Sequence, residues 1–372
     1  MKIGILTLPL EINYGGILQA FALQRTLIKM GHNVVTIDRH NRKKYPSLRV
    51  HVLGYCKRMF LHYLRGKNVS TKWNPFISES DFFSSSVLTQ KFISRNIELT
   101  KRIFSDQLVE IDEEYKFDAY VVGSDQIWNA NYCPDSFLGY VKRDGVKKVV
   151  YAASCGNKSF FKDSYKVSIC KELAKHFAGI SVREKSLIEL CKREIAVDVQ
   201  WVLDPTLLLS KEEYLQVTEN NVGTEPILFS YILDSNQKKD EIVSSLARTL
   251  NLTVVNGNRL NTEGDAAKAY PSVDDWIRNV NRSQFVITDS FHGTVFAILF
   301  NKQFMCIGNK KRGLSRFLSL LSIFGLENRL IDESNISNID VVLKETIDYD
   351  IVNNIIDKER QNSLTFLRYS LQ

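Results

Sequence analysis

Polar side chains suited to acid–base chemistry and anion binding occur in three short segments of this sequence. Each segment follows an apolar run with the length of a buried strand and comes just before a helical stretch. The segments are Asn13-Tyr14-Gly15-Gly16, Gly123-Ser124-Asp125-Gln126 with Trp128, and Asp289-Ser290 with His292. In open α/β sheets, ligands bind beyond the carboxyl ends of the strands. We therefore expect the three segments to converge on one ligand site.

The residue types in these segments point to an anionic ligand and to proton transfer. Backbone N–H groups at a helix N-terminus attract anions, and glycines allow a close approach. Carboxylates and imidazoles are the usual general acids and bases. Each segment alone could be a tight turn or a helix cap, and capping is the structural alternative for Asp289. The recurrence of the pattern after three strands favours a ligand site.

Short apolar runs alternate with helical stretches along the chain. Helical stretches such as 17–30, 238–250 and 293–299 separate the strand-like runs. This alternation is typical of doubly wound parallel sheets in α/β proteins. The strand-like runs include Lys2 to Leu8, Val34 to Ile37, Ala119 to Val122, Lys148 to Ala152, Gly179 to Val182, Ile227 to Tyr231, Leu252 to Val255, Phe285 to Thr288 and Gln303 to Ile307.

The chain length of 372 residues allows two domains with separate cores. The segment "VLDPTLLLSKEEY" and the polar stretch after it have the character of a crossover, and a new strand–helix–strand unit follows Glu225-Pro226. We expect an N-terminal α/β domain over residues 1–215, a Rossmann-like domain over 216–345 and a C-terminal segment over 346–372.

The composition excludes several classes of protein. With 44% hydrophobic and 24% charged residues, the chain is globular. No stretch approaches the ~20 apolar residues of a membrane span, and the N-terminus lacks a signal-peptide layout, so we expect the cytoplasm. Six cysteines without a CxxC pair or a histidine at ligand spacing predict reduced thiols and no metal site. No nucleic-acid-binding motif is present, so no nucleic-acid partner is expected.

The net charge of +7 is unevenly distributed. Residues 39–72 contain ten Lys or Arg residues and no Asp or Glu. Apolar residues recur at helical spacing from Val52 to Leu64, with Lys57, Arg58 and Arg65 on the other face, which predicts a basic amphipathic helix. This helix either packs on the core with a solvated basic face, or lies on anionic lipid, or caps an anionic substrate.

Six motifs of this chain, taken in series, resemble the polysaccharide pyruvyl transferase family. They are "NYGGILQAFALQ", "YVVGSDQIWN", "YAASCG", "ISVREKS", "VLDPTLLL" and "TDSFHGTVFAILFNKQF", in this order from Asn13 to Phe304. The resemblance implies a GT-B-like fold, with two facing Rossmann-like domains, parallel sheets, the active site in the cleft, and a C-terminal helix that returns to the first domain.

The resemblance also implies the reaction. Members of the family move a pyruvyl group from phosphoenolpyruvate to a sugar diol, which gives a cyclic ketal and phosphate. By this analogy the acceptor is a lipid-linked precursor of a capsule or exopolysaccharide, met at the cytoplasmic face of the inner membrane. Phosphoenolpyruvate is the donor substrate, and no cofactor or metal is expected. The acceptor would lie on the first domain and the donor on the second.

Site residues follow from the positions that match the family motifs. Proton transfer and catalysis are expected of His292, Asp125 and Asp289. Binding of the donor phosphate or carboxylate is expected of Arg183, Ser290, Lys310, Lys311 and Arg312. Contact with the acceptor or an anion is expected of Asn13, Tyr14, Gly15, Gly16, Ser124, Gln126 and Trp128. The structural alternative for Arg183 is an ion pair with Glu184 or Glu189.

One position departs from the family pattern. Many members carry an arginine two residues before the motif histidine, where this chain has Ser290. Either the Ser290 hydroxyl contacts the phosphate, or the missing charge comes from Lys310, Lys311 and Arg312 after the next predicted strand. We favour the second.

Two other functions remain open from the sequence. The first is a GT-B glycosyltransferase that uses a nucleotide sugar, although no diphosphate-binding signature is visible beyond the glycine turns. The second is a non-catalytic, membrane-associated glycan-binding protein. The presence of Asp125, Arg183, Asp289 and His292 together speaks against the second alternative.

Overall fold

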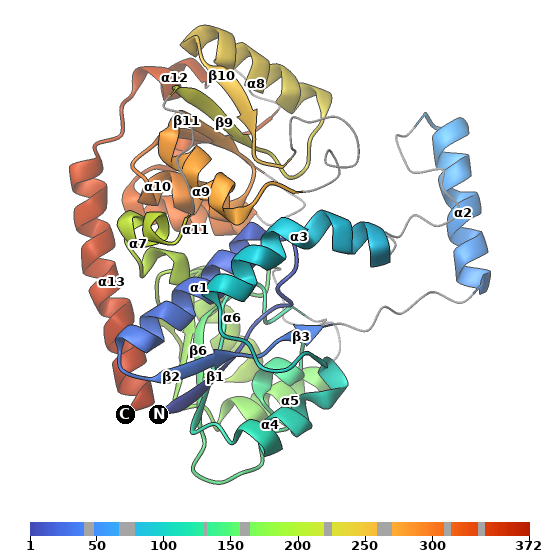
Figure 1. Cartoon of the computed structure of the whole chain (residues 1–372), viewed down its shortest axis with the longest axis vertical. Coiled ribbons are helices and arrows are strands. Elements are labelled where there is room, and N and C mark those ends of the chain that lie inside the picture. The colour runs from blue at the N-terminus through green and yellow to red at the C-terminus, as the bar shows by residue number, and fades with distance from the viewer. Residues whose placement is uncertain are drawn as a thin grey trace.

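The chain forms two α/β lobes, each built on an all-parallel sheet (Figure 1). The computed structural model describes residues 1–40, 48–66, 79–129, 132–156, 164–218, 225–258, 270–308, 314–333 and 339–372. Within these residues no helix is both long and apolar enough to cross a bilayer.

The first lobe contains a six-stranded sheet in the order β2-β1-β5-β6-β7-β8. Its strands are buried on both faces, as expected when helices cover a parallel sheet on each side. Ile3 pairs with Val34 of β2 and with Ala119 of β5, which places β1 between these two strands. The strands are β1 (Lys2–Leu6), β2 (Asn33–Thr36), β5 (Ala119–Val122), β6 (Lys147–Ala153), β7 (Gly179–Val182) and β8 (Gln200–Trp201), with a separate pair β3 (Arg39–His40) and β4 (Ile103–Phe104).

The second lobe contains a five-stranded sheet in the order β10-β9-β11-β12-β13. Its strands are β9 (Ile227–Tyr231), β10 (Thr253–Asn256), β11 (Ser283–Thr288), β12 (Gln303–Ile307) and β13 (Leu330–Ile331). The predicted strands all exist, with ends that move by one or two residues. The predicted boundaries at 215 and 345 stay predictions; the change of sheet falls between Trp201 and Ile227.

The helices lie between the strands, as the alternation predicted. They are α1 (Tyr14–Lys29), α2 (Leu48–Tyr63), α3 (Glu79–Asn96), α4 (Leu108–Tyr115), α5 (Ser164–Ala174), α6 (Ser186–Ile195), α7 (Lys211–Gln216), α8 (Gln237–Leu250), α9 (Val273–Arg282), α10 (Phe291–Leu299), α11 (Leu314–Phe324), α12 (Ile339–Lys344) and α13 (Tyr349–Leu371).

The start of α1 corrects one expectation. The sequence predicted a turn at Asn13-Tyr14-Gly15-Gly16 and a helix from Ile17, whereas the helix begins at Tyr14 with Asn13 as its N-cap residue. The two glycines lie in the first helical turn and have no positive φ angle. A Cβ atom on Gly15 would lie 2.0 Å from Nδ1 of His292, so Gly15 is required for close contact between the lobes rather than for a turn.

Aromatic side chains join the two lobes in one continuous core. Tyr14 of the first lobe stacks on Trp276 of the second, with ring centroids 5.7 Å apart. The ring of Phe296, from α10, lies 5.0 Å from Trp276 and 5.0 Å from Tyr214. Tyr214 in turn contacts Phe21 of α1. Such pairs add to the burial free energy and fix the lobes against each other.

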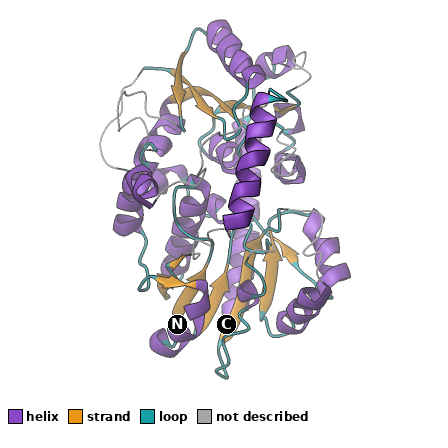
Figure 2. Ribbon diagram, turned by 90° about the vertical axis from the view of Figure 1, so that its right-hand side faces the viewer, coloured by secondary structure: helices purple, strands orange, loops and turns teal. Residues whose placement is uncertain are grey.

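The C-terminal helix α13 runs along both lobes and ends beside the N-terminus (Figures 1 and 2). Its last turns, with Phe366, Leu367 and Leu371, pack among the buried residues of β1, β5 and β6. The Ser363 hydroxyl accepts a hydrogen bond from the backbone N–H of Leu203 (3.0 Å). This arrangement confirms the predicted return of the C-terminal helix to the first domain.

The basic helix α2 stands clear of the two lobes (Figure 1). Several of its apolar side chains are exposed: Leu53 is 70% exposed and Tyr63 69%, and Leu64, directly after the helix, is 73% exposed. Phe60 is 49% exposed, so the apolar stripe faces away from the described core. Parts of the predicted 39–72 segment lie outside the described residues.

We expect the docking of α13 to stabilise the whole fold. Leu367 is fully buried, so Leu367→Ala should lower the free energy of unfolding by about 2–5 kcal/mol through lost apolar contacts and a residual cavity. Tyr369, two residues further on and 74% exposed, provides the control, since Tyr369→Ala should change it by less than about 0.5 kcal/mol. Urea denaturation measures both. Equal midpoints for Leu367→Ala and wild type would contradict the described packing.

Candidate functional site

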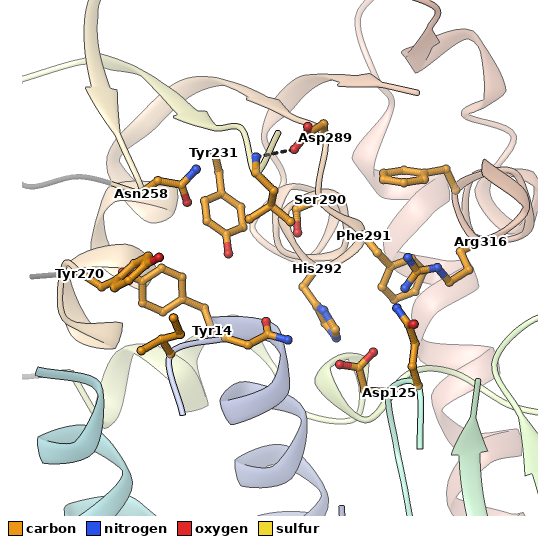
Figure 3. Close-up of a pocket in the computed structure, with 15 residues that line it drawn as sticks. Tyr14, Asp125, Tyr231, Asn258, Tyr270, Asp289, Ser290, Phe291, His292 and Arg316 are labelled. Carbon is orange, nitrogen blue, oxygen red and sulfur yellow. Dashed lines mark hydrogen bonds between the residues drawn. The ribbon is translucent and has the colours of Figure 1, made fainter. Parts of the chain in front are cut away.

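A polar cavity of about 260 Å³ lies between the lobes, at the carboxyl ends of their strands. Figure 3 shows side chains of both lobes pointing into it. The first lobe contributes Ile12, Asn13, Tyr14, Asp125 and Gln126, and the second contributes Tyr231, Leu233, Asn258, Tyr270, Asp289, Ser290, Phe291, His292, Arg316 and Phe317. Six of the predicted contact and catalytic residues besides His292 therefore meet here: Asn13, Tyr14, Asp125, Gln126, Asp289 and Ser290.

Two helices direct their N-termini at this cavity. The N-cap residue of α1 is Asn13 and that of α10 is Ser290, and both line the cavity. The Ser290 hydroxyl accepts a hydrogen bond from the backbone N–H of Gly293 (3.4 Å). The positive ends of the two helix dipoles therefore favour a negatively charged group between the lobes.

His292 lies at the contact between these two helices. It is nearly buried, and its ring rests against the Cα atom of Gly15 in α1. Its Nε2 atom lies 3.7 Å from Oδ2 of Asp204 and has no hydrogen-bond partner among the described residues. The imidazole thus faces the cavity with one nitrogen atom near a carboxylate, which suits a group that exchanges protons.

The guanidinium of Arg183 lies behind the cavity, between two carboxylates. Nη1 donates to Oδ2 of Asp204 (2.6 Å), and Nη2 donates to Oδ1 of Asp125 (2.9 Å). All three side chains are buried, and Arg183 does not line the cavity. Glu184 approaches Nε of Arg183 at 3.6 Å. The ion pair offered as the structural alternative therefore exists, but its closest partners are Asp125 and Asp204.

These charges shift one another's pKa values. Burial alone would raise the pKa of Asp125, but electrostatic interactions, of which that with the Arg183 guanidinium is the largest, outweigh it and lower that pKa. The same holds for Asp204: burial opposes ionisation, yet interactions with His292 and Arg183 lower the pKa of its carboxyl. Both carboxylates therefore stay ionised, and Asp125 presents a negative charge to the cavity.

Arg316, from the first turn of α11, supplies a positive charge to the cavity wall. Its guanidinium lies 5.9 Å from the ring centroid of Phe291, and that of Arg183 lies 4.5 Å from the same ring. Both distances are within the range of cation–π attraction. Phe291 therefore separates two cations, one lining the cavity and one behind it.

Asp289 holds a loop in place. Its carboxylate accepts hydrogen bonds from the backbone N–H groups of Leu233 (2.6 Å) and Asp234 (3.1 Å), and from Nζ of Lys239 (2.6 Å). Lys239 and Asp289 are both buried. These contacts bind the loop after β9 and the start of α8 to the end of β11, beside His292.

The remaining predicted residues lie in several places. Gly16 is buried in the first turn of α1, and Ser124 donates its backbone N–H to Gln19 and its hydroxyl to the backbone oxygen of Ala152. Trp128 is buried and stacks on Phe137, with centroids 5.2 Å apart. None of these lines the cavity. Lys310, Lys311 and Arg312 lie outside the described residues.

Sequence reasoning missed Asp204, which lies behind the cavity. It also missed polar residues that line the cavity, among them Arg316, Tyr231, Asn258 and Tyr270. Asp204 belongs to the quoted motif "VLDPTLLL", but no role was assigned to it; its carboxylate accepts hydrogen bonds from the N–H (3.0 Å) and hydroxyl (2.6 Å) of Thr206. Tyr231 ends the predicted strand Ile227–Tyr231 but was not singled out, and Asn258 and Tyr270 belong to none of the three polar segments.

No group of three or more His, Cys, Asp or Glu side chains with metal-ligand geometry occurs among the described residues. The expectation of a reaction without a metal remains a prediction.

Solved structures with a similar fold include three UDP-GlcNAc 2-epimerases. The enzyme from Neisseria meningitidis, bound to UDP-GlcNAc, has a TM-score of 0.54 at 11% identity, with 100% of this chain and 99% of that chain covered. The enzyme from Methanocaldococcus jannaschii gives 0.52 at 11% identity over 93% and 92% of the two chains. A putative one from Listeria monocytogenes gives 0.50 at 10% identity over 97% and 91%. At such low identity the likeness shows the fold alone, and it confirms the GT-B architecture.

Comparison of the sequence with curated proteins finds no match. A family model, in contrast, matches residues 13–311, the range that contains the helix N-termini, the buried ion pairs and His292. Because this match covers most of the chain, the chain belongs to the polysaccharide pyruvyl transferase family.

Proposed function

We propose that the protein transfers a pyruvyl group from phosphoenolpyruvate to two hydroxyl groups of a saccharide, forming a cyclic ketal and releasing phosphate. The observation that carries this proposal is the meeting of His292, Asp125 and Arg316 in one small cavity at two helix N-termini. Its volume of about 260 Å³ lies below the ~300–1,000 Å³ of sites for drug-sized ligands, which supports a small anionic donor.

In the proposed reaction, one residue first donates a proton to the donor substrate and later accepts a proton from the sugar hydroxyl. Protonated His292 gives its proton to C3 of phosphoenolpyruvate, which leaves positive charge at C2. The first sugar hydroxyl attacks C2 and returns a proton to His292. The C2–O bond then breaks, phosphate leaves, and the second hydroxyl closes the ketal while its proton departs with the phosphate. His292 suits this exchange because it lines the cavity and its Nε2 atom has no hydrogen-bond partner among the described residues.

Asp125 and Arg316 stabilise opposite charges. Since its pKa is lowered, Asp125 remains a carboxylate that stabilises the developing positive charge at C2 and orients the attacking hydroxyl. Arg316 and the two helix N-termini hold the phosphate and carboxylate of the donor. In this proposal Arg316 provides the charge that Ser290 lacks. Contributions from Lys310, Lys311 and Arg312 stay a prediction.

Arg183 acts as a positioning residue in this scheme. Its guanidinium is turned away from the cavity and fixes Asp125 and Asp204. Removing it would leave two buried carboxylates without their partner, at a cost of about 3–5 kcal/mol of stability. A large loss of activity in Arg183→Ala is therefore inseparable from a loss of stability. No divalent metal takes part in the proposed reaction.

We expect His292→Ala to lower kcat at least ~100-fold, because it removes the group that exchanges protons in the transition state. The assay follows phosphate release from phosphoenolpyruvate with a panel of lipid-linked galactose, glucose and mannosamine acceptors. The exposed His176 supplies the matched control, and His176→Ala should keep the wild-type rate. Near-normal turnover of His292→Ala would show that His292 takes no part in catalysis and only packs between the lobes.

Arg316→Ala should raise KM for phosphoenolpyruvate about 10- to 100-fold, since a charge-assisted contact with the donor is lost. Arg193, which is exposed and paired with Glu194, is the control for the loss of one positive charge. Initial rates at varied phosphoenolpyruvate measure both variants. An unchanged KM in Arg316→Ala would remove this residue from the donor site.

We further propose that the acceptor is lipid-linked and that α2 brings the enzyme to the cytoplasmic face of the membrane. Two features of α2 support this. Its apolar side chains Leu53, Phe60 and Leu64 point to solvent, and the described part of the 39–72 segment carries Lys57, Arg58 and Arg65 with no acidic residue. Burial of the stripe and the attraction of each cation to anionic lipid, about 1 kcal/mol, would act together.

Co-sedimentation with vesicles of 70% phosphatidylcholine and 30% phosphatidylglycerol tests this attachment. Lys57→Glu with Arg58→Glu should abolish sedimentation while phosphate release with a short soluble acceptor is unchanged, because neither residue lines the cavity. Lys171→Glu, exposed on α5, with Lys175→Glu, exposed just after its end, makes the same charge change elsewhere and should sediment like wild type. Wild-type sedimentation of the α2 variant would refute the proposal.

A further inference from the structure

A second, larger cavity of about 920 Å³ opens at the ends of β9 and β10, against α8. Leu233, Asn258 and Tyr270 line both this cavity and the smaller one that contains His292. The two spaces are therefore neighbours with a shared wall.

The lining of this second cavity suits a neutral, hydroxyl-rich ligand. Among the described residues it contains the carboxylates of Asp234 and Asp240 and no Lys or Arg. Carboxylates such as those of Asp234 and Asp240 accept hydrogen bonds from hydroxyl groups, and side-chain amides such as those of Asn256 and Asn258 both accept and donate them. Tyr270 adds an aromatic ring with a polar end at the junction of the two cavities.

The amino group of Lys239 is held by hydrogen bonds, and this residue does not line the second cavity. Lys239, in the first turn of α8, is buried and donates to Oδ2 of Asp289 (2.6 Å) and to the backbone oxygen of Asp234 (2.9 Å). The start of α8 also carries Asp240, whose carboxylate accepts a hydrogen bond from Ser235 (2.8 Å). Asp234 and Asp240 belong to the lining and none of its described residues is a Lys or Arg, so the described part of the cavity does not favour a nucleoside diphosphate.

We infer that this second cavity binds the sugar units of the acceptor that adjoin the pyruvylated sugar. The inference rests on the proposed pyruvyl transfer and extends it: the acceptor is an oligosaccharide recognised over several units by the second lobe. It differs from the expectation that the acceptor lies on the first domain. The volume of about 920 Å³ lies within the range of sites that enclose ligands larger than phosphoenolpyruvate.

Blocking the cavity provides the test. Ser244 lies on the exposed surface of α8 and lines the cavity, whereas its neighbour Ser245, also exposed, is not part of the lining. Ser244→Trp fills the space, and Ser245→Trp introduces the same side chain on another face of the helix. The two acceptors are the methyl glycoside of the sugar that supports phosphate release, and a tetrasaccharide that ends in the same sugar.

Ser244→Trp should raise KM for the tetrasaccharide at least ~10-fold and leave kcat and KM for the methyl glycoside unchanged, while Ser245→Trp should match wild type with both. An unchanged KM for the tetrasaccharide would overturn the inference, as would equal effects of both variants or equal effects on both acceptors. Absence of phosphate release by the wild-type protein with every acceptor would instead refute the proposed function, and the inference with it.

Discussion

The buried guanidinium of Arg183 is the contact on which the site depends. It comes from the end of β7 and joins Asp125, from the loop after β5, to Asp204, from the loop after β8. Three loops of the first lobe are thereby fixed at one edge of its sheet. A buried charge without its partner is costly, so this arrangement holds only while all three groups are present. Asp204 then meets His292 of the second lobe, which extends the same charge network across the cleft.

Contact between the lobes completes the site. Gly15 lets α1 approach His292 so closely that a Cβ atom at position 15 would clash with the imidazole. The neighbouring Tyr14 stacks on Trp276. The Asp289–Lys239 pair fixes the second lobe's loop beside the same histidine. The cavity is therefore assembled from two rigid edges, each with its own buried ion pair. This arrangement suits a reaction in which positive charge develops between preorganised groups.

The sequence predicted the parallel α/β architecture because buried strands and their helices leave strong local patterns. The three polar loops could be found in the same way, because each follows an apolar run with the length of a strand. It also predicted that His292, Asp125 and Ser290 would meet. It could not separate a residue in the cavity from one behind it: Arg183 is a residue type that binds anionic ligands, yet it lies behind the cavity and its partners Asp125 and Asp204 come from loops distant in the chain. Tyr270 and Arg316 escaped notice because nothing in their neighbourhood marks them.

In the proposed reaction the bond between C2 and the bridging oxygen of phosphoenolpyruvate breaks, so that a pyruvyl rather than a phosphoryl group is transferred. Phosphoenolpyruvate labelled with oxygen-18 at the bridging position, incubated with the protein and the acceptor panel, tests this most directly by phosphorus NMR of the released phosphate. The account predicts that the label appears in inorganic phosphate and that the saccharide gains the mass of a pyruvate ketal. Unlabelled phosphate, or a phosphorylated saccharide, would contradict it.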